Sequence, residues 1–171
     1  MDCRPLQYVL SACGGQKLAG EGQGMLCRVC TDSRQARPGD LFFALPGDRF
    51  DGHEYVAEAA RKGASAAVVQ RDRQVPNHGA CILIGVADTR RALGQFAAVY
   101  RNDFSLPVVA VAGSNGKTTT KELIASVLRQ KLPTLWSEAS FNNDIGVPLT
   151  LLRLETSHQA AVLEAGTNHP G

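Results

Sequence analysis

The 171-residue sequence has little net charge and few aromatic residues. Its formal charge is +2, and only 6% of its residues are Phe, Trp or Tyr. Proteins that bind nucleic acid need a basic surface, often with aromatic rings on which bases stack. We therefore expect no nucleic-acid partner.

The sequence also lacks any apolar run of the roughly 18 residues that a membrane-spanning helix needs. The segment 10–13 (Leu-Ser-Ala-Cys) resembles a lipoprotein cleavage site, but the stretch before it is short and holds Pro5 and Gln7. Such a stretch cannot form the apolar region of an export signal. We predict no membrane span and no export.

Cysteine and histidine are too sparse for a disulfide framework or a metal site. The five cysteines are an odd number without regular spacing, which favours free thiols in a reducing compartment; they are Cys3, Cys13, Cys27, Cys30 and Cys81. Cys27 and Cys30 have no second pair to complete a zinc site. His78, His158 and His169 have no partner at metal-ligand spacing, so we assign them no chemistry.

The order of apolar segments predicts an α/β fold, with 44% hydrophobic residues available for a core. Residues 1–86 are expected to form a small mixed α/β domain, and residues 87–106 a connecting helix and linker. In the first domain, strands are predicted at 26–30, 41–45, 66–69 and 81–84, with a helix at 53–62. A type II turn is predicted at 37–40, because Pro38 and Gly39 occupy its centre. Asp88 is the expected N-cap of a helix that ends near residue 101.

Residues 107–171 are expected to begin a doubly wound sheet. Strands are predicted at 108–112, 134–136 and 160–164, alternating with helices at 117–130 and 145–152. Three strands are fewer than such sheets usually have. We therefore expect the chain to contain only the first part of this domain.

The most informative segment is Gly113-Ser114-Asn115-Gly116-Lys117-Thr118-Thr119, which follows an apolar strand and precedes a helix. Glycines let a loop approach phosphate oxygens closely, and a helix start offers them N–H groups. Lys117 can reach the β and γ phosphates, and the Thr118 hydroxyl can bind Mg²⁺. The segment thus predicts a phosphate-binding loop for a nucleoside triphosphate.

The alternative is a surface turn with Lys117 as a solvated charge. The loop is also shorter than the usual pattern, which would need glycine where Val111 stands. Against the alternative, the loop lies between a strand and an amphipathic helix, in the order that a phosphate site requires. The apolar residues that mark this helix are Leu123, Ile124, Val127 and Leu128.

Glu164 ends a second apolar strand, just before Gly166. In parallel sheets, residues at the carboxyl ends of neighbouring strands face one ligand-binding edge. We expect Glu164 to lie near the phosphate loop and to hold Mg²⁺; the alternative is a carboxylate that faces water.

These residues resemble the Mur ligases, the ATP-dependent amide-forming enzymes of peptidoglycan precursor synthesis. The segment 113–119 is similar to that family's shortened phosphate loop. Three further segments, 118–122 (TTTKE), 141–152 (FNNDIGVPLTLL) and 164–171 (EAGTNHPG), resemble the member that adds D-alanyl-D-alanine. The resemblance continues from about Thr31 in the first domain.

The resemblance implies an activity. The reaction of that member would join D-alanyl-D-alanine to UDP-N-acetylmuramoyl-tripeptide through an acyl phosphate, with ATP and Mg²⁺. Lys117 and Glu164 would be catalytic, Thr118 and Glu164 would hold Mg²⁺, and the loop from Gly113 to Thr119 would bind ATP together with Asn142 and Asn143. The cell-wall function, a cytoplasmic location and a monomeric complete protein are part of the same expectation.

The resemblance also makes residues 1–86 a UDP-sugar-binding domain. Its substrate-binding residues would be Ser33, Arg34, Gly47, Asp51 and His53. From the residues alone, Asp32 and Ser33 favour a turn that satisfies its own backbone, and Asp51 a helix N-cap with His53 in solvent.

Two alternative functions stay open at this point. The chain could be a UDP-sugar-binding module without catalysis, or part of the preceding ligase, which adds the third amino acid. Family members are longer, so this chain is expected to be an N-terminal fragment that is inactive alone. The third residue of the tripeptide cannot be read from the sequence.

Overall fold

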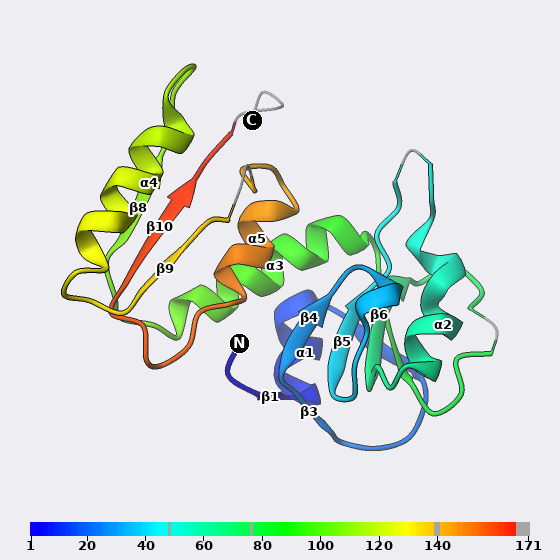
Figure 1. The fold of residues 1–171 in the computed structure, drawn as a ribbon. Helices are drawn as coiled ribbons and strands as arrows, with labels where there is room; N and C mark the ends of the chain where they lie inside the picture. The colour runs from blue at the N-terminus through cyan, green and yellow to red at the C-terminus, as the bar shows by residue number, and fades with distance from the viewer. Residues whose placement is uncertain (48, 76, 139–140, 167–171) are drawn as a thin grey trace. The chain divides into compact units, whose positions relative to one another are not determined.

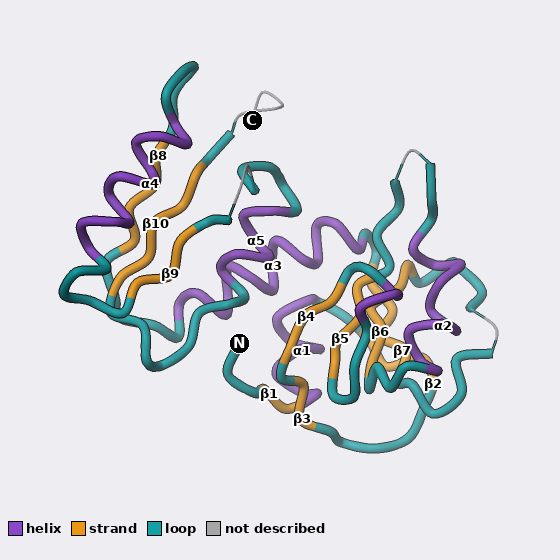
Figure 2. The backbone as a smooth tube through the Cα atoms, in the orientation of Figure 1, coloured by secondary structure: helices purple, strands orange, loops and turns teal. Residues whose placement is uncertain are grey.

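The computed structural model describes residues 1–47, 49–75, 77–138 and 141–166. The chain divides into two compact units, Met1–Phe96 and Ala97–Gly171, each of which has its own sheet. Figure 1 labels the helices and strands, and Figure 2 distinguishes them by type. The predicted α/β class is confirmed. The predicted boundaries at residues 86 and 107 stay predictions.

The first unit contains a five-stranded sheet of order β2-β7-β6-β5-β4. Strands β4 to β7 are parallel, and β2 pairs antiparallel with β7 at one edge. The strands are β2 (Gln16–Ala19), β4 (Arg28–Cys30), β5 (Asp40–Phe43), β6 (Ala66–Gln70) and β7 (Ile82–Val86). All four predicted strands of this unit are therefore present.

Both faces of this sheet are covered, because neighbouring residues of a buried strand point to opposite sides. Phe42 packs with residues of α2 (Val56–Arg61), including Val56 and Ala59. On the other face, the ring of Phe43 stacks on Phe96 of α3 (Thr89–Asn102), with ring centroids 6.2 Å apart. Each apolar side chain buried in this way stabilises the unit by about 1.5 to 3 kcal/mol.

An ion pair between the half-buried Arg28 and the buried Asp40 supports the register between β4 and β5. Arg28 and Asp40 are directly opposite in the parallel pair. The guanidinium of Arg28 donates to both carboxylate oxygens of Asp40, at 2.8 and 2.5 Å, and Asp40 is only 2% exposed. A one-residue slip would leave this buried carboxylate without its cation, so the pair favours a single register.

The turns and caps of the first unit follow the sequence expectations. The N–H of Asp40 donates to the carbonyl of Arg37, and Gly39 has φ 88°, which gives the predicted type II turn. Asp88 accepts the N–H of Arg91 and so caps α3 as expected. The predicted helix at 53–62 begins as a 3₁₀ turn, η2 (Gly52–Tyr55), and continues as α2.

The expectation of five free thiols is wrong for two of them: Cys3 and Cys27 form a disulfide. The cause is a two-stranded sheet in which β1 (Arg4–Pro5) pairs antiparallel with β3 (Met25–Leu26), Arg4 opposite Leu26. This register brings the two flanking cysteines together. The other three cysteines are free and buried, and burial raises the pKa of Cys13 to about 12 and that of Cys81 to about 11.

The N-terminal helix α1 (Leu6–Cys13) occupies a segment for which the sequence analysis predicted no element. Val9 on this helix is fully buried, and the ring of Tyr8 contacts Phe96 with centroids 6.3 Å apart. The segment that resembles a lipoprotein signal is therefore part of a folded core.

The second unit contains a three-stranded parallel sheet of order β8-β10-β9. The strands are β8 (Val108–Val111), β9 (Thr134–Trp136) and β10 (Ala160–Glu164). Helix α4 (Lys117–Leu128) contacts all three strands (Figure 1). Helix α5 (Gly146–Leu151) contacts β10. Each strand and helix predicted for this unit is present, with shorter helices than expected.

Tyr100 anchors the last part of α3 within the second unit. Its side chain is fully buried, and its hydroxyl donates a 2.6 Å hydrogen bond to the carbonyl of Leu154. A ring contact with Phe104, at 5.1 Å between centroids, adds to this anchor.

Among the described residues, no helix is long and apolar enough to cross a membrane.

Candidate active site

The phosphate-loop segment leaves the carboxyl end of β8 and enters the N-terminus of α4. Gly113 and Gly116 have φ values of 149° and 73°, a region that favours glycine. A Cβ on Gly116 would meet no atom within 4 Å, so the loop is open at this point. Gly116 is the N-cap of α4 without a side-chain hydrogen bond. The loop therefore has the form that an anion site at a helix N-terminus needs.

Lys117 lies across this loop. Its Nζ donates a 2.8 Å hydrogen bond to the carbonyl of Gly113. The ammonium thus lies over the bend that would receive phosphates, in a hydrogen bond that is exposed to solvent. A phosphate oxygen could replace the carbonyl as its acceptor with little movement.

Thr118 and Asn142 converge on the carboxylate of Glu164. The Thr118 hydroxyl donates to Oε2 of Glu164 at 2.8 Å, and the Asn142 amide donates to Oε1 at the same distance. The three residues come from the start of α4, the loop before α5 and the end of β10. The structure therefore brings together side chains that the sequence analysis took from three separate segments.

Glu164 is buried, with 1% of its surface exposed, so the alternative of a carboxylate facing water is wrong. Burial alone would raise its pKa. The hydrogen bonds from Asn142 and Thr118, together with the charges of Lys121 and Lys117, outweigh burial and lower the pKa of Glu164. The carboxylate is therefore ionised and able to hold a cation at neutral pH.

The segment after Glu164 packs against Asn142. The N–H of Gly166 donates to the carbonyl of Asn142 at 2.7 Å, and a Cβ on Gly166 would approach that carbonyl to 3.0 Å. Glycine permits this close contact between two of the segments that carry the Mur ligase resemblance. The end of the third segment, residues 167–171 with His169, lies outside the described residues.

Asn143 has a different set of contacts from Asn142. Its side-chain oxygen accepts the N–H groups of Ile145 and Gly146, at 3.2 and 2.7 Å. These bonds hold the start of α5. Its predicted role in nucleotide binding stays a prediction, as do those of Ser114, Asn115 and Thr119, which lie in the exposed loop and first helical turn.

The oxygen atoms of this cluster fit Mg²⁺. A hydroxyl and a carboxylate are hard ligands, and Mg²⁺ in phosphate sites usually takes only one or two protein ligands, with phosphates and waters completing the octahedron. Within the described part of the chain, no group of three or more His, Cys, Asp or Glu residues could hold a metal. Thr118 and Glu164 would thus bind a cation only in company with a phosphorylated ligand.

The first unit has a cavity of about 580 Å³ at the carboxyl ends of β4 and β5. Parallel sheets bind ligands at this edge. Apolar rings and polar groups both contribute to the wall, as in most small-molecule sites. The lining residues are Thr31, Asp32, Ser33, Arg34, Phe42, Leu45, Phe50, Gly52, Tyr55 and Glu58.

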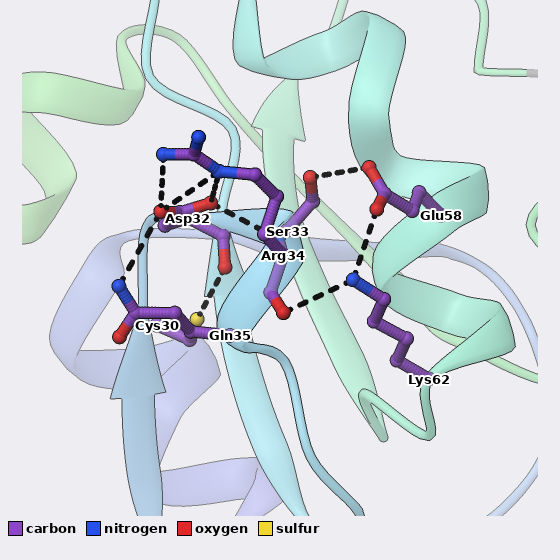
Figure 3. Close-up of polar contacts among 7 residues, drawn as sticks. All are labelled: Cys30, Asp32, Ser33, Arg34, Gln35, Glu58 and Lys62. Atoms are coloured by element: carbon purple, nitrogen blue, oxygen red, sulfur yellow. Dashed lines mark hydrogen bonds and ion pairs between the residues drawn. The ribbon is translucent and has the colours of Figure 1, made fainter.

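Ser33 is held in this cavity by Glu58, as Figure 3 shows. The Ser33 hydroxyl donates to Oε2 of Glu58 at 2.7 Å, and Lys62 pairs with Oε1 at 3.0 Å. Lys62 also donates to the carbonyl of Arg34 at 3.0 Å. The bonds from Ser33 and Lys62 lower the pKa of Glu58, so an ionised carboxylate lies in the cavity wall.

Arg34 extends to the surface beside Asp32 (Figure 3). Its guanidinium donates to both carboxylate oxygens of Asp32, at 2.9 and 2.8 Å, and its backbone N–H donates to one of them. This is the self-satisfied turn that the residues alone favoured. The bonds with Arg34 lower the pKa of Asp32 to about 2. With 81% of its side chain exposed, Arg34 remains available to an anionic ligand.

Asp51 and His53 line a different cavity, of about 380 Å³. Asp51 caps η2 as expected, but His53 is only 8% exposed, so its expected position in solvent is wrong. Nε2 of His53 accepts the N–H of Gln70 at 2.9 Å, which leaves the proton of the neutral ring on Nδ1, 2.6 Å from Asp51. Both ring nitrogens are thus used within the fold.

Gly47 contributes backbone only. Its N–H donates to the carbonyl of Phe50, which lines the first cavity, at 3.0 Å. The substrate-binding roles predicted for Ser33, Arg34, Gly47, Asp51 and His53 stay predictions.

Two segments of this chain match known protein families. Residues 28–101 match the Mur ligase family, catalytic domain, and residues 111–171 match the Mur ligase middle domain. The chain belongs to the Mur ligase family.

Two curated relatives of this Mur ligase chain carry the same enzyme name. This chain is 43% identical over 160 residues to the UDP-N-acetylmuramoyl-tripeptide--D-alanyl-D-alanine ligase of Haemophilus influenzae. It is 45% identical over 159 residues to the enzyme of the same name from Escherichia coli. Each alignment covers 90% of this chain and 34% of the relative. The chain thus spans about a third of the length of these relatives.

Solved structures agree with this similarity. A crystal structure of MurF from Acinetobacter baumannii matches with a TM-score of 0.90 at 42% identity, over 100% of this chain and 38% of that one. MurF from Thermotoga maritima in complex with ADP matches with a TM-score of 0.75 at 35% identity, over 84% of this chain and 33% of that one.

The sequence analysis of this Mur ligase chain missed the residues that support its candidate sites. Glu58 was not singled out, although its spacing to Lys62 is that of a helical ion pair. Lys121 was noted only within a motif, although it lies one helical turn after Lys117. Ser137, which contacts Glu164, carries no signal in the sequence, because the contact depends on strand pairing.

Proposed function

We propose that the complete protein carrying this sequence is the ATP-dependent ligase that joins D-alanyl-D-alanine to UDP-N-acetylmuramoyl-tripeptide. The observation that carries the proposal is the cluster of Thr118, Asn142 and Glu164 at the mouth of the phosphate loop, with 2.8 Å hydrogen bonds among them. The shared name of the relatives supports this particular substrate pair.

ATP supplies the phosphoryl group that activates the terminal carboxylate of the tripeptide as an acyl phosphate, and Mg²⁺ offsets the charge of the phosphates. The amine of D-alanyl-D-alanine would then attack the activated carbonyl, with release of phosphate. Such transfers depend on positioning and charge neutralisation more than on a protein nucleophile. The chain's residues are suited to those two tasks.

Lys117 would move its ammonium from the carbonyl of Gly113 to the phosphate oxygens, where it neutralises charge that grows during transfer. N–H groups of the loop and of the first turn of α4 would orient the phosphates. Thr118 and Glu164 would hold Mg²⁺, and Asn142 would keep the Glu164 carboxylate in place through its 2.8 Å bond. Each of these roles uses an atom that already lies at the loop.

The first unit would bind the uridine nucleotide. Its cavity of about 580 Å³ has aromatic walls from Phe42, Phe50 and Tyr55, which suit a pyrimidine ring. The exposed Arg34 provides donors at the same cavity for phosphate oxygens, and the hydroxyl oxygen of Ser33, whose hydrogen goes to Glu58, would accept a hydrogen bond from a ligand hydroxyl. Asp51, His53 and Gly47 remain part of the proposal as residues that support this edge of the sheet.

The ligase that adds the third amino acid is the nearest rival. A structure of UDP-N-acetylmuramoyl-L-alanyl-D-glutamate--2,6-diaminopimelate ligase matches this chain at 18% identity with a TM-score of 0.58, a likeness in fold alone. The relatives that carry the D-alanyl-D-alanine name are 34 to 46% identical. This difference favours the dipeptide as the acceptor.

The test is ADP formation by the complete protein, with Mg²⁺, ATP and UDP-N-acetylmuramoyl-tripeptide present. We expect ADP release that requires D-alanyl-D-alanine and yields the pentapeptide product by mass spectrometry. ADP release when UDP-N-acetylmuramoyl-dipeptide replaces the tripeptide substrate and a single amino acid replaces D-alanyl-D-alanine would identify the preceding ligase. Binding of the UDP-linked substrate, measured by calorimetry, without any ADP release would identify a binding module.

A cytoplasmic location and a monomeric state belong to the same proposal, because the reaction consumes ATP and each ligase would hold both substrates on one chain. Fractionation and size-exclusion chromatography with light scattering test these two points.

A further inference from the structure

Lys121 is the most unusual charged residue of the second unit. It lies one helical turn after Lys117 on α4, and its side chain is completely buried. Lysine is almost never fully buried unless its charge is paired, because removal of the ammonium from water is costly. The described contacts of Lys121 therefore show which groups stabilise its buried charge.

The ammonium of Lys121 is directed at Ser137, the residue that follows β9. Nζ donates a 2.6 Å hydrogen bond to the carbonyl of Ser137 and pairs with Glu122 at 2.9 Å. A charge-assisted bond to a buried carbonyl is stronger than a neutral one. The end of β9 is thus fixed to α4.

Ser137 in turn contacts Glu164. Its hydroxyl accepts the backbone N–H of Glu164 at 3.2 Å, and its own N–H donates to the carbonyl of Val162 at 3.0 Å. Ser137 is completely buried, like Lys121. One residue therefore joins the buried lysine to the strand end that carries the candidate magnesium ligand.

The path from Lys121 through Ser137 reaches atoms of Glu164 that Thr118 and Asn142 do not contact. Those two residues hold the carboxylate of Glu164 from the loop side, whereas Ser137 holds its backbone from β9. The charge of Lys121 also favours the ionised form of Glu164. Removal of a group that supports a metal ligand commonly lowers metal affinity by about 10- to 100-fold.

From this arrangement we infer that Lys121 is a positioning residue for the magnesium-nucleotide site, and that it acts through Ser137 on Glu164 without touching the nucleotide. The inference rests on the proposed function, because it presumes that Glu164 holds Mg²⁺. A purely structural lysine would instead support α4 and leave the preference for Mg²⁺ unchanged.

The experiment is calorimetric titration of ADP into the complete protein, with and without Mg²⁺. The ratio of the two affinities isolates the contribution of the metal. In the wild type we expect Mg²⁺ to strengthen ADP binding. In Lys121→Met, which keeps a long side chain and removes the charge, this gain should fall by about tenfold or more, while metal-free binding of ADP stays close to the wild-type value.

Two further variants make the result specific. Lys131→Met removes an exposed lysine of the same unit and should leave the gain from Mg²⁺ unchanged. Ser137→Ala removes the hydroxyl that accepts the Glu164 N–H and should reduce the gain in the same direction as Lys121→Met. If Lys121→Met does not fold by circular dichroism, Ser137→Ala decides the question alone.

The outcomes separate this inference from the proposed function. If wild-type protein binds no ADP under either condition, the nucleotide site itself is wrong, and the inference falls with it. If Mg²⁺ strengthens wild-type binding and strengthens binding by folded Lys121→Met or by Ser137→Ala equally, only the inference is overturned. An equal loss of affinity with and without Mg²⁺ also overturns it, because that pattern indicates a structural role.

Discussion

The hydroxyl of Thr118 donates a 2.8 Å hydrogen bond to the carboxylate of Glu164, a residue 46 positions later in the sequence. The register of the parallel sheet creates this contact, because Glu164 at the end of β10 lies opposite Val111 at the end of β8. Both strands therefore end at one edge, where the loop from β8 turns into α4. The candidate magnesium site is a direct consequence of this strand pairing.

Replacement of Thr118 by valine tests this contact. Valine keeps the shape and removes the hydroxyl, so we expect the gain in ADP affinity from Mg²⁺ to fall by about tenfold. Thr118→Ser, which keeps the hydroxyl, is the matched control and should stay near the wild type. Calorimetry with and without Mg²⁺ measures both, and equal gains in wild type and Thr118→Val would contradict the assignment.

Asn143 should contribute mainly to stability. Its side-chain oxygen accepts the N–H groups of Ile145 and Gly146 at the start of α5. Asn143→Ala removes both bonds and should lower the free energy of unfolding by about 1 kcal/mol, the usual net contribution of a side-chain hydrogen bond. Urea denaturation followed by circular dichroism measures this change.

Asn143→Asp is the control for that measurement, because aspartate retains an oxygen at the same place. It should remain within about 0.5 kcal/mol of the wild type. If alanine and aspartate have the same effect, the side-chain oxygen does not hold the helix start.

The Asp32 carboxyl should titrate at unusually low pH. Its bonds with Arg34 lower the pKa to about 2, below the ordinary value of about 3.9 in an unfolded chain. The ionised carboxylate therefore stabilises the fold at pH values above the unfolded pKa, and this stabilisation is lost as the pH falls through about 2. NMR of the carboxyl carbon over the acid range measures the pKa.

Arg34→Ala should move the pKa of Asp32 upward, toward its ordinary value, because the guanidinium provides the first cause of the shift. The exposed Arg37, three positions later, offers a control: Arg37→Ala should leave the pKa of Asp32 where it is. An unchanged pKa in Arg34→Ala would show that the pair seen beside the first cavity does not form in solution.

The parts of the fold that follow from local pattern could be predicted from the sequence. The apolar run before Gly113 and the helical spacing after Lys117 gave the strand, loop and helix of the phosphate site in the right order. Pro38 and Gly39 gave the turn, and Asp88 gave the N-cap of α3. In each case the signal lies within a few neighbouring residues.

Pairing between distant segments could be predicted for Glu164 and the phosphate loop, where two long apolar strands mark it, but not where the paired segments carry no such pattern. Strands β1 and β3 have two residues each, too few for any periodicity, and so the disulfide between Cys3 and Cys27 was missed. The burial of Lys121 was missed for a similar reason, because a lysine in a helix is ordinarily exposed. Its partner Ser137 lies 16 residues away, just after β9.

The most direct test of the central claim is the rate of ADP release by Lys117→Ala, with Mg²⁺, ATP, UDP-N-acetylmuramoyl-tripeptide and D-alanyl-D-alanine at saturating concentrations. Lys131→Ala, at an exposed position, serves as the control. If Lys117 neutralises charge on the transferred phosphoryl group, the rate should fall by about 100-fold or more while the circular dichroism spectrum is unchanged. A folded Lys117→Ala protein that releases ADP at the rate of the Lys131→Ala control would contradict the phosphate-loop assignment.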